Sequence, residues 1–505
     1  MKSLITLVFV ASFISVHAET YFISPNGDNS NSGLSPSNAF LTIQHGVDVA
    51  LAGDSVLVAN GNYAGFVAMD NSGTSSNPIL IMAVESNVNI YSPCSYNNLD
   101  GINVENVSWI IIDGFKVTGM PRTGIRTALS NHVTIRNNFC SANFKWGILT
   151  GFAENVIIEN NECSYSTDEH GIYHSNSADN PIIRFNRSHH NNRCGIHMNG
   201  DVSMGGDGFI SNASVYGNII YENGAAGGSG INCDGVVNSN FYNNLLYENH
   251  ASGISLYQID AGAPSTGNKI FNNTIVNATN GRWCVNITEN CSDNQIMNNI
   301  LINQHPWRGS IVVAATALSG FVSDYNLVKD ALSPDGDATV MTLNQWQNLG
   351  YDTHSQIAGS LTQLFYNAAN ENYHPINNSG QMIDAGTSQV SLVMNTDLDG
   401  ISRPQGSGFD IGSYEFSGTT SLQTTPLMHD IIVSRSEIGY YLHPLQTGDQ
   451  IIIYDTKGTR LFSTVSKNSE AFIPKEKLCM GMNLYQIITA NGRSRKTGKL
   501  IYSEK

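Results

Sequence analysis

Short runs of aliphatic and β-branched residues recur through the middle of the chain and alternate with turns rich in Asn and Gly. The run VIIEN at 156–160 is representative: it is long enough for one strand and too short for a helix. An Ile recurs at the same place in successive runs, and the first six of these follow a Gly. The members of this column are Ile125, Ile148, Ile172, Ile196, Ile231 and Ile254, continued by Val285 and Ile311. The pattern predicts short strands whose column residues face inward.

A second register supports a repeat of about 24 residues. Equivalent Asn residues occur at intervals of 23 to 32 residues, at Asn138, Asn161, Asn186, Asn218, Asn244, Asn273 and Asn299. No single repeat can bury its own apolar side, whereas repeats stacked ~4.8 Å apart bury a continuous core. The Asn side chains would then form a ladder from coil to coil. We therefore expect an all-β, parallel β-helix; a leucine-rich solenoid would need an LxxLxL pattern, and a propeller would need blades of ~40 residues.

The opening segment at 21–63, which begins YFISPNGDNSNSG, strengthens this interpretation. With the repeats it resembles the right-handed parallel β-helix superfamily, which holds pectate lyases, alginate lyases, polysaccharide epimerases and polygalacturonases. The resemblance covers roughly 20–416 and implies a pectin lyase-like fold. It also implies that the amphipathic segment at 43–52 caps the open end of the helix, which would otherwise template edge-to-edge aggregation.

The two ends of the chain differ from the repeats. Lys2 precedes an apolar run that ends in Val16-His17-Ala18, which predicts a secretory signal peptide at 1–18. The β-helix domain would then span 19–416, with a closing segment at 373–416 similar to that of many secreted bacterial β-helix proteins. We expect the acids of this segment to form turns rather than a calcium site; they are Asp397, Asp399 and Asp410.

A polar stretch at 417–427 is expected to be a linker. Residues 428–505 then carry 11 bases and 7 acids, against 14 and 34 in the preceding 427 residues. Alternating apolar strands and Gly turns predict a small β-sandwich. Its phrases GTRLF, NLYQI and GKLI resemble the C-terminal sorting domain of the type IX secretion system, although GMNLY departs slightly from that pattern. The resemblance implies a protein that binds this secretion machinery and is released from, or anchored on, the outer surface of a Gram-negative bacterium. A small carbohydrate-binding or adhesive module is the alternative.

Composition excludes several classes of protein. The chain has 505 residues, more than the ~250–300 of one ordinary core. Its 41 acids and 25 bases give a net charge of −16, which excludes an electrostatic nucleic-acid binder. After the signal peptide, no apolar stretch approaches the ~20 residues of a transmembrane segment. We expect a secreted monomer. Eight cysteines lack CxxC spacing, and Cys140 and Cys163 occupy equivalent places, so a disulfide and two free thiols both remain open.

Polar columns on the outside of the predicted coils suggest a binding surface. Side chains one and three residues after the Ile column should face outward, as should those three residues before it. Six such coils would place the candidate residues on one surface, on the order of 25–30 Å long. Its members include Arg122, Lys145, Arg193, His197, Asn199, Asp234, Tyr257 and Arg282. That length suits several sugar units of an acidic polysaccharide, whose carboxylates the bases could bind.

The residue types favour a lyase that cleaves a uronate polymer by β-elimination. The catalytic candidates are Lys145, Glu169, Arg193 and His197. Lys145 or His197 could abstract the proton, Arg193 could bind the carboxylate, and Glu169 could hold the bases in place. The expected substrate-binding residues are Arg122, Tyr173, Asn232, Tyr257 and Arg282. Oxygen ligands from Asn199, Asp201 and Asp234 could bind Ca²⁺, the one cofactor that we predict.

Other functions remain open at this stage. A uronate C5-epimerase would use the same groups, and a glycoside hydrolase would need two carboxylates such as Glu169 or Asp201 with Asp234. A non-catalytic adhesion protein could bind glycans with the same surface. The catalytic phrases of polygalacturonases, pectate lyases and epimerases are absent, so no family's catalytic set can be carried over. Five histidines of the segment 170–201 suggest a metal site, but three of them belong to different columns; the five are His170, His174, His189, His190 and His197.

Overall fold

The computed structural model describes residues 18–393, 395–417 and 432–502, the last range with gaps at 436–438, 444, 446–447, 456–459, 467–470 and 489–493. The predicted signal peptide at 1–18 and linker at 417–427 therefore lie outside the described residues, apart from Ala18 and Ser417.

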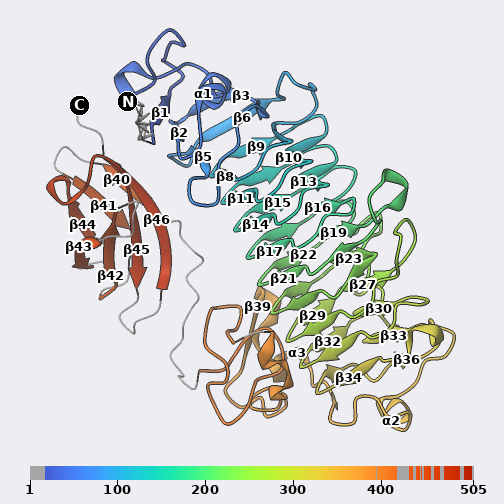
Figure 1. The fold of residues 1–505 in the computed structure, drawn as a ribbon. Coiled ribbons are helices and arrows are strands. Elements are labelled where there is room, and N and C mark those ends of the chain that lie inside the picture. The colour runs from blue at the N-terminus through green and yellow to red at the C-terminus, as the bar shows by residue number, and fades with distance from the viewer. Residues whose placement is uncertain are drawn as a thin grey trace, which may run out of the picture.

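Three long parallel sheets run along the coiled part of the chain, and each coil contributes one strand to each sheet (Figure 1). Sheet 1 consists of β1 (Thr20–Ile23), β2 (Ser55–Val58), β5 (Ile79–Ala83), β8 (Ile110–Asp113), β11 (Thr134–Arg136), β14 (Ile157–Glu159), β17 (Ile182–Arg184), β21 (Ser214–Tyr216), β25 (Asn240–Tyr242), β28 (Lys269–Phe271), β31 (Gln295–Met297) and β34 (Val322–Asp324). Sheet 2 consists of β3 (Gly61–Ala64), β6 (Val88–Ser92), β9 (Lys116–Thr118), β12 (Phe139–Ser141), β15 (Glu162–Ser164), β18 (Arg187–His189), β22 (Ile219–Tyr221), β26 (Leu245–Tyr247), β29 (Thr274–Asn277), β32 (Ile300–Asn303), β35 (Leu327–Val328) and β37 (Gln356–Ile357).

Sheet 3 carries the column of Ile residues that the sequence predicts. It consists of β4 (Phe66–Ala68), β7 (Ile102–Glu105), β10 (Thr123–Ala128), β13 (Trp146–Gly151), β16 (Ile172–Ser175), β19 (Ile196–Asn199), β23 (Ile231–Asp234), β27 (Ile254–Tyr257), β30 (Val285–Ile287), β33 (Ile311–Val313) and β36 (Leu332–Ser333). From Ile125 to Ile311 the predicted residues pair directly in register, and all are fully buried. The parallel β-helix is thus confirmed.

The predicted Asn ladder is also present, at the turn between sheets 1 and 2. The Nδ2 group of Asn218 donates to Oδ1 of Asn244 at 2.9 Å, and the backbone N–H of Asn218 donates to the same atom at 3.1 Å. The same contact links successive members from Asn138 to Asn326. A second ladder, which the sequence analysis does not predict, joins Asn191, Asn223 and Asn249 at the turn that follows sheet 2. Both ladders satisfy backbone groups that the tight turns leave unpaired.

Short helices cover the two ends of the solenoid. Helix α1 (Ile43–Val49) packs Ile43 and Val47 into the core beside β1, β2 and β4, within the segment 43–52 where a cap is expected. At the other end, α2 (Leu343–Gln347) buries Leu343 and Trp346 in the same core. The remaining small elements are α3 (Leu361–Leu364), β38 (Phe365–Asn367) with β39 (Asn372–Pro375), β20 (Ile210–Ser211) with β24 (Val236–Val237), and the 3₁₀ turns η1 (Pro36–Asn38), η2 (Val202–Met204), η3 (Ala315–Ala317), η4 (Ala368–Asn370), η5 (Ser388–Leu392) and η6 (Lys475–Lys477).

The closing segment, together with α3 and β38 just before it, packs against the outside of the coils. Leu364, Phe365 and Tyr373 share a buried cluster with Tyr247 of sheet 2. The predicted turn-forming role of the acids fits the structure: Asp397 accepts hydrogen bonds from the backbone of Ile401 and Glu415, and Asp410 accepts bonds from Asp384 and Phe416. A fully buried ion pair joins Arg403 to Glu415 at 2.8 Å. Asp399 instead lies 2.8 Å from His374.

The C-terminal residues form two small antiparallel sheets. One consists of β40 (Ile432–Arg435), β41 (Gly439–His443) and β44 (Ala471–Pro474); the other consists of β43 (Arg460–Val465), β42 (Gln450–Tyr454), β45 (Gly481–Ile488) and β46 (Ser494–Tyr502). Side chains of both sheets, among them Leu442, Ile453, Ile473 and Ile487, form one buried cluster. The all-β class and the small C-terminal sandwich are therefore confirmed.

Two further expectations concern the cysteines and the membrane. Cys140 and Cys163 are neighbours in register, as predicted, and all eight cysteines are free thiols, seven of them buried. Among the described residues, no helix has the length and apolarity needed to cross a membrane.

Candidate functional site

Most of the candidate residues lie on the outer face of sheet 3, or in the turns just before its strands, from β10 to β30. We refer to this surface as the sheet 3 face. The column one residue after the Ile column runs in register through Arg126, Leu149, Tyr173, His197, Asn232 and Ser255. The column three residues after it includes Ser175, Asn199, Asp234 and Tyr257. The parallel strands thus bring side chains from distant repeats onto one surface.

Lys145 and Glu169 are joined directly, as the sequence analysis expects. The Lys145 ammonium lies 2.6 Å from Oε1 of Glu169 and 3.7 Å from Oδ2 of Asp168. Trp146 donates its indole N–H to Oε2 of Glu169 at 2.9 Å. The hydrogen bond that Lys145 donates to Glu169 raises the pKa of Lys145, and burial opposes this only partly. Lys145 is therefore held as a cation, which suits it to bind a carboxylate better than to abstract a proton.

The remaining bases fall into two groups. Arg122 forms a two-pronged ion pair with the buried carboxylate of Asp100, at 2.9 and 2.6 Å, and Arg126 pairs with Glu105. Arg193 and Arg282 are exposed, and neither takes part in an ion pair within the described ranges. Free cationic charge on the sheet 3 face is thus supplied by Arg193 and Arg282, while Arg122 already has a partner.

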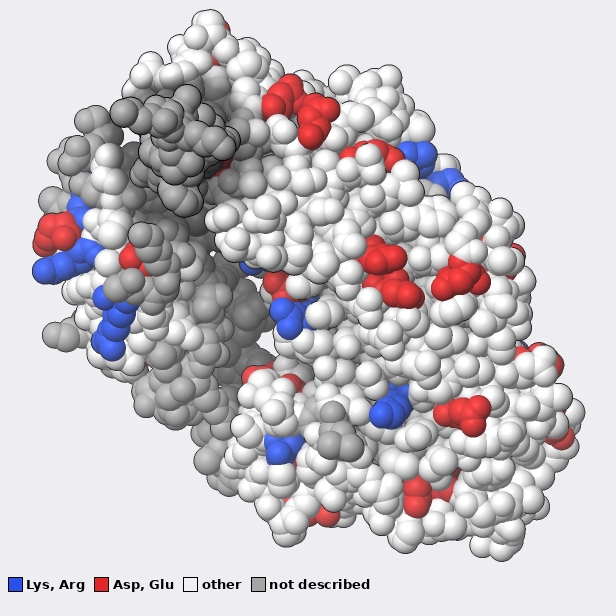
Figure 2. Space-filling model, viewed as in Figure 1, with Lys and Arg blue, Asp and Glu red and all other residues white. Residues whose placement is uncertain are grey.

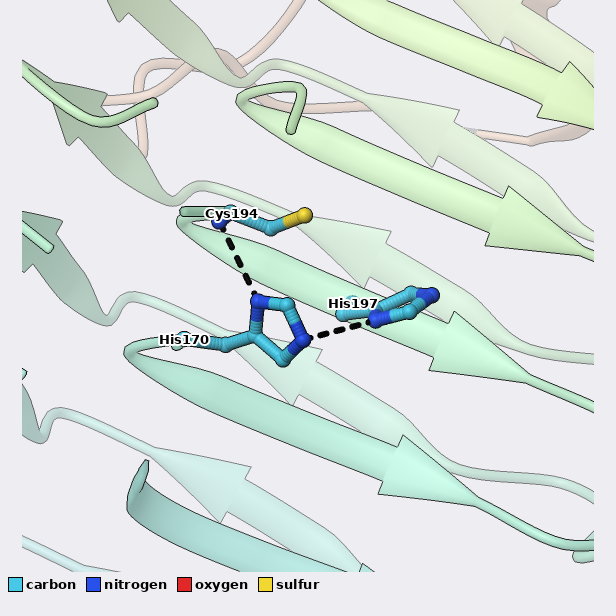
Figure 3. A group of neighbouring side chains, drawn as sticks. All are labelled: His170, Cys194 and His197. Carbon is cyan, nitrogen blue, oxygen red and sulfur yellow. Dashed lines mark hydrogen bonds between the residues drawn. The ribbon is translucent and has the colours of Figure 1, made fainter. Parts of the chain in front are cut away.

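A chain of hydrogen bonds connects two histidines at the centre of the sheet 3 face (Figure 3). The backbone N–H of Cys194 lies 3.2 Å from Nδ1 of His170. Nε2 of His170 lies 2.9 Å from Nδ1 of His197, and Nε2 of His197 lies 3.3 Å from the Tyr257 hydroxyl. Asn232 donates to the same hydroxyl at 2.6 Å. Strands two coils apart, β19 and β27, therefore meet through side chains.

Burial keeps both histidines neutral. It lowers the pKa of His170 to about 3, with smaller contributions from the positive charges of Arg193 and Lys145. Burial also lowers the pKa of His197 well below its usual value, and repulsion by His170 adds to this. The neutral rings can act as both donors and acceptors, which the hydrogen-bond chain requires.

Tyrosines and amides surround this pair. The ring of Tyr173 stacks on His197, with centroids 5.0 Å apart and an interplanar angle of 23°. Asn199 donates to the Tyr173 hydroxyl at 3.3 Å, and burial raises the pKa of Tyr173 to about 12. Tyr173 and Tyr257 are thus held in place within the site, and both keep a hydroxyl group that can exchange a proton.

A metal ion does not fit this group as it is arranged, although His170, Cys194 and His197 bring their ligand atoms within 4.8 Å of one another. A histidine that binds a metal through one nitrogen normally donates from the other. Nδ1 of His170 faces a backbone donor, so it must accept, and Nε2 then carries the proton. Burial also raises the pKa of Cys194 to about 12, which disfavours the thiolate that a metal would need.

The predicted calcium ligands hold two inserted loops, at 200–212 and 260–267, in place. Both carboxylate oxygens of Asp234 accept backbone N–H groups, from Ile259 and Asp260, each at 2.8 Å. Asp201 accepts bonds from the backbone and hydroxyl of Ser203 at the start of η2. These bonds occupy oxygen atoms that Ca²⁺ would need. Calcium binding at Asn199, Asp201 and Asp234 stays a prediction.

Three residues of the site have no place in the columns that the sequence analysis uses: Trp146, His170 and Cys194. All three lie two residues before the Ile column, and Thr123 pairs in register with Trp146 at the same position. This fourth column was a usable signal. Charge alone would not have found the site, because acidic side chains are scattered over the face of the molecule in Figure 2 and basic ones are fewer.

Comparison with known proteins supports the architecture. The family model of the right handed beta helix region matches residues 66–204. The chain is similar to the crystal structure of the pectate lyase Pel9A, with 16% identity, a TM-score of 0.53, and coverage of 79% of this chain and 97% of that chain. It is also similar to an alginate lyase from Paenibacillus sp., with 21% identity, a TM-score of 0.45, and coverage of 53% and 93%. None of the curated proteins compared with the chain matches it. The fold is therefore a right-handed parallel β-helix with pectate lyase-like structural neighbours.

Proposed function

We propose that the protein is a secreted polysaccharide lyase that cleaves an acidic, uronate-containing chain by β-elimination on the sheet 3 face. One observation carries the proposal: the positive charges of exposed Arg193 and of Lys145 act on His170, which is bonded to His197, and the side chains of Tyr173 and Tyr257 contact His197. β-Elimination needs a cation that neutralises the uronate carboxylate next to a group that moves a proton. The pectate lyase-like fold is compatible with this activity.

The structure suggests a division of roles among the candidates. Arg193 is free to bind the carboxylate, and its planar guanidinium suits a bidentate contact. Lys145, fixed by Glu169, adds positive charge beside it. Arg282 lies further along the same edge and would bind a distant acidic sugar. Tyr173 stacks on His197, and Asn232 donates a hydrogen bond to the Tyr257 hydroxyl. Both residues therefore hold groups that can move a proton in position.

The test is direct. The protein without its signal peptide would be incubated with pectate, alginate and glycosaminoglycans, with and without Ca²⁺, while ultraviolet absorbance reports new unsaturated ends. We expect a rise with at least one polymer, and a loss on the order of 10²-fold or more for Arg193→Gln. Lys269→Gln, on the outer side of sheet 1, is the matched control and should retain activity.

A second candidate function has one observation in its favour. Lys145, Arg122 and both histidines are already bonded to protein groups, as in a rigid surface built for binding alone. A non-catalytic glycan-binding or adhesion protein would retain an acidic polymer without any absorbance change or shortening of the chain. Altered sugar configuration without new absorbance would instead favour a uronate C5-epimerase. Shortened chains without new absorbance would favour a glycoside hydrolase.

We further propose that residues 428–505 direct export through the type IX secretion system, after a signal peptide at 1–18. The two-sheet sandwich supports this, because such modules fold independently of the domain that they follow. The protein would then act as a monomer outside the cell or on the outer membrane of a Gram-negative bacterium. Deletion of 428–505 should leave the β-helix inside the cell envelope, which fractionation of the expressing cells would detect.

A further inference from the structure

One backbone amide fixes the direction of every hydrogen bond in the histidine chain. The N–H of Cys194 can only donate, so Nδ1 of His170 must accept it. A neutral imidazole carries one proton, so that proton lies on Nε2 of His170. Nε2 then donates to Nδ1 of His197 across 2.9 Å, as the dashed line in Figure 3 shows.

The same reasoning continues to Tyr257. Because Nδ1 of His197 accepts, its proton lies on Nε2, which donates to the Tyr257 oxygen at 3.3 Å. Asn232 donates a second N–H to that oxygen at 2.6 Å. Two donors therefore converge on the Tyr257 oxygen, and the hydroxyl proton itself is left to point away from both. Such a pair of donors favours negative charge on the oxygen that they share.

We propose that Tyr257 is the catalytic proton-transfer residue of the sheet 3 face, and that His197 and His170 are positioning residues that act through it. The proposal rests on the proposed lyase function and deepens it. It also replaces Lys145 and His197 as candidate bases: Lys145 is a cation bonded to Glu169, and both nitrogens of His197 are engaged.

The reaction balances with this single residue. The Tyr257 phenolate takes the C5 proton of the uronate, and the electron pair of the C–H bond forms the C4–C5 double bond. The bond from C4 to the leaving oxygen breaks, and that oxygen takes the same proton from Tyr257. The phenolate is regenerated, stabilised by the N–H groups of His197 and Asn232. Arg193 would neutralise the carboxylate.

The environment of Tyr257 predicts an alkaline pH profile. Burial raises its pKa, and the neighbouring acidic groups of Cys194, Asp234 and Cys233 add to this. The resting side chain is therefore a phenol, and its active fraction should grow about tenfold per pH unit through the neutral range. Burial keeps the facing His197 neutral in that range. His170, behind it, also remains neutral, because burial and the positive charges of Arg193 and Lys145 lower its pKa, although the carboxylate of Glu169 lies 3.5 Å from its Nε2.

The first test uses kinetics on a cleaved polymer. Tyr257→Phe removes one oxygen atom and should lower kcat on the order of 10²–10⁴-fold, with the Kd for the polymer unchanged. His197→Gln keeps a donor and should retain more activity than His197→Ala, with both pH profiles displaced to higher pH. Tyr366→Phe, which alters an exposed tyrosine of β38, is the control.

The second test needs no substrate. In the full chain labelled with ¹⁵N-histidine, long-range ¹⁵N–¹H spectra should show protonated Nε2 and bare Nδ1 for both His170 and His197. A protonated Nδ1 on either ring overturns the relay. Full activity in Tyr257→Phe, with loss in Lys145→Ala, assigns the proton transfer to Lys145 and overturns the proposal. If no acidic polymer is cleaved, the lyase function and the catalytic role of Tyr257 both fall, whereas the spectra still report on the relay alone.

Discussion

The buried asparagines show how single residues determine the coil geometry. Asn218 is fully buried and bonds in two directions: its oxygen accepts from the backbone and side chain of Asn186, and its amide donates to Ile183, Tyr216 and Asn244. A serine or aspartate could not supply both the donors and the acceptor at this position. The Asn repeat in the sequence is therefore a structural requirement of the turn.

Substitution of one such residue should be costly. Asn218→Ala leaves the backbone N–H of Asn186 and the carbonyl of Ile183 without these partners inside the core. We expect the free energy of unfolding to fall by about 3 kcal/mol or more, since each buried unsatisfied group costs about 1–3 kcal/mol. Denaturant unfolding measures this. Asn280→Ala, at an exposed position, should change the free energy of unfolding by less than about 0.5 kcal/mol. Equal effects of Asn218→Ala and Asn280→Ala would contradict the structural role of the Asn ladder.

Residue-level prediction from the sequence works within strands and fails beside them. The outward position of His197 and the burial of Ile196 follow from the two-residue period of a strand. His170 and Cys194 lie in the bend just before their strands, where this period no longer applies. Tyr257 is found in the correct column, but its contact with His197 spans two coils. A contact across two coils depends on the side-chain rotamer, which the spacing of residues in the sequence does not reveal.

At the scale of elements, two inserted loops support each other beside the sheet 3 face. The backbone N–H of Val202 bonds to Asp260, and the N–H of Gly262 bonds to Gly208. Asp234 anchors the second loop with both oxygens. The long intervals in the Ile column, from Ile196 to Ile231 and from Ile254 to Val285, show that these two coils contain extra residues. The packing of one loop on the other involves backbone atoms of Gly-rich segments, so no hydrophobic pattern in the sequence indicates it.

The loop anchor can be separated from a calcium site by substitution. Asp234→Asn keeps the shape of the side chain but turns one acceptor into a donor that faces a backbone N–H. We expect a loss of about 1–3 kcal/mol in the free energy of unfolding, the same in Ca²⁺ and in a chelator. If Ca²⁺ stabilises the wild-type protein but not the variant, Asp234 is instead a calcium ligand.

At the scale of the whole molecule, burial lowers the pKa of three histidines of the coils, His170, His174 and His197. Nε2 of His174 donates to the carbonyl of Ala178 at 2.8 Å, so Nδ1 of the neutral ring accepts from the hydroxyl of Thr150 at 2.7 Å. Burial lowers its pKa to about 4. The unfolded chain therefore binds a proton at this site below its ordinary pKa of 6.5 while the folded chain does not, so stability falls as the pH drops from about 6.5 toward 4. Asp410 acts in the opposite sense, because burial raises its pKa to about 7.

A variant isolates the contribution of one histidine from these opposing groups. His174→Gln should destabilise the protein at pH 7, and the difference from wild type should shrink by about 2 kcal/mol at pH 5. Denaturant unfolding of both proteins at the two pH values tests this. A difference that stays constant would mean that His174 is not held neutral.

The proposed function of the whole molecule requires that the sheet 3 face act on an acidic polysaccharide. The most direct measurement is the initial rate of ultraviolet absorbance increase on pectate, alginate and glycosaminoglycans, for wild type, Arg193→Gln and Tyr257→Phe. We predict a rate that rises with pH for wild type on at least one polymer, and a near-complete loss in both variants while each remains folded. The proposal would be contradicted if the wild type cleaved none of these polymers, or if the variants cleaved them at undiminished rates.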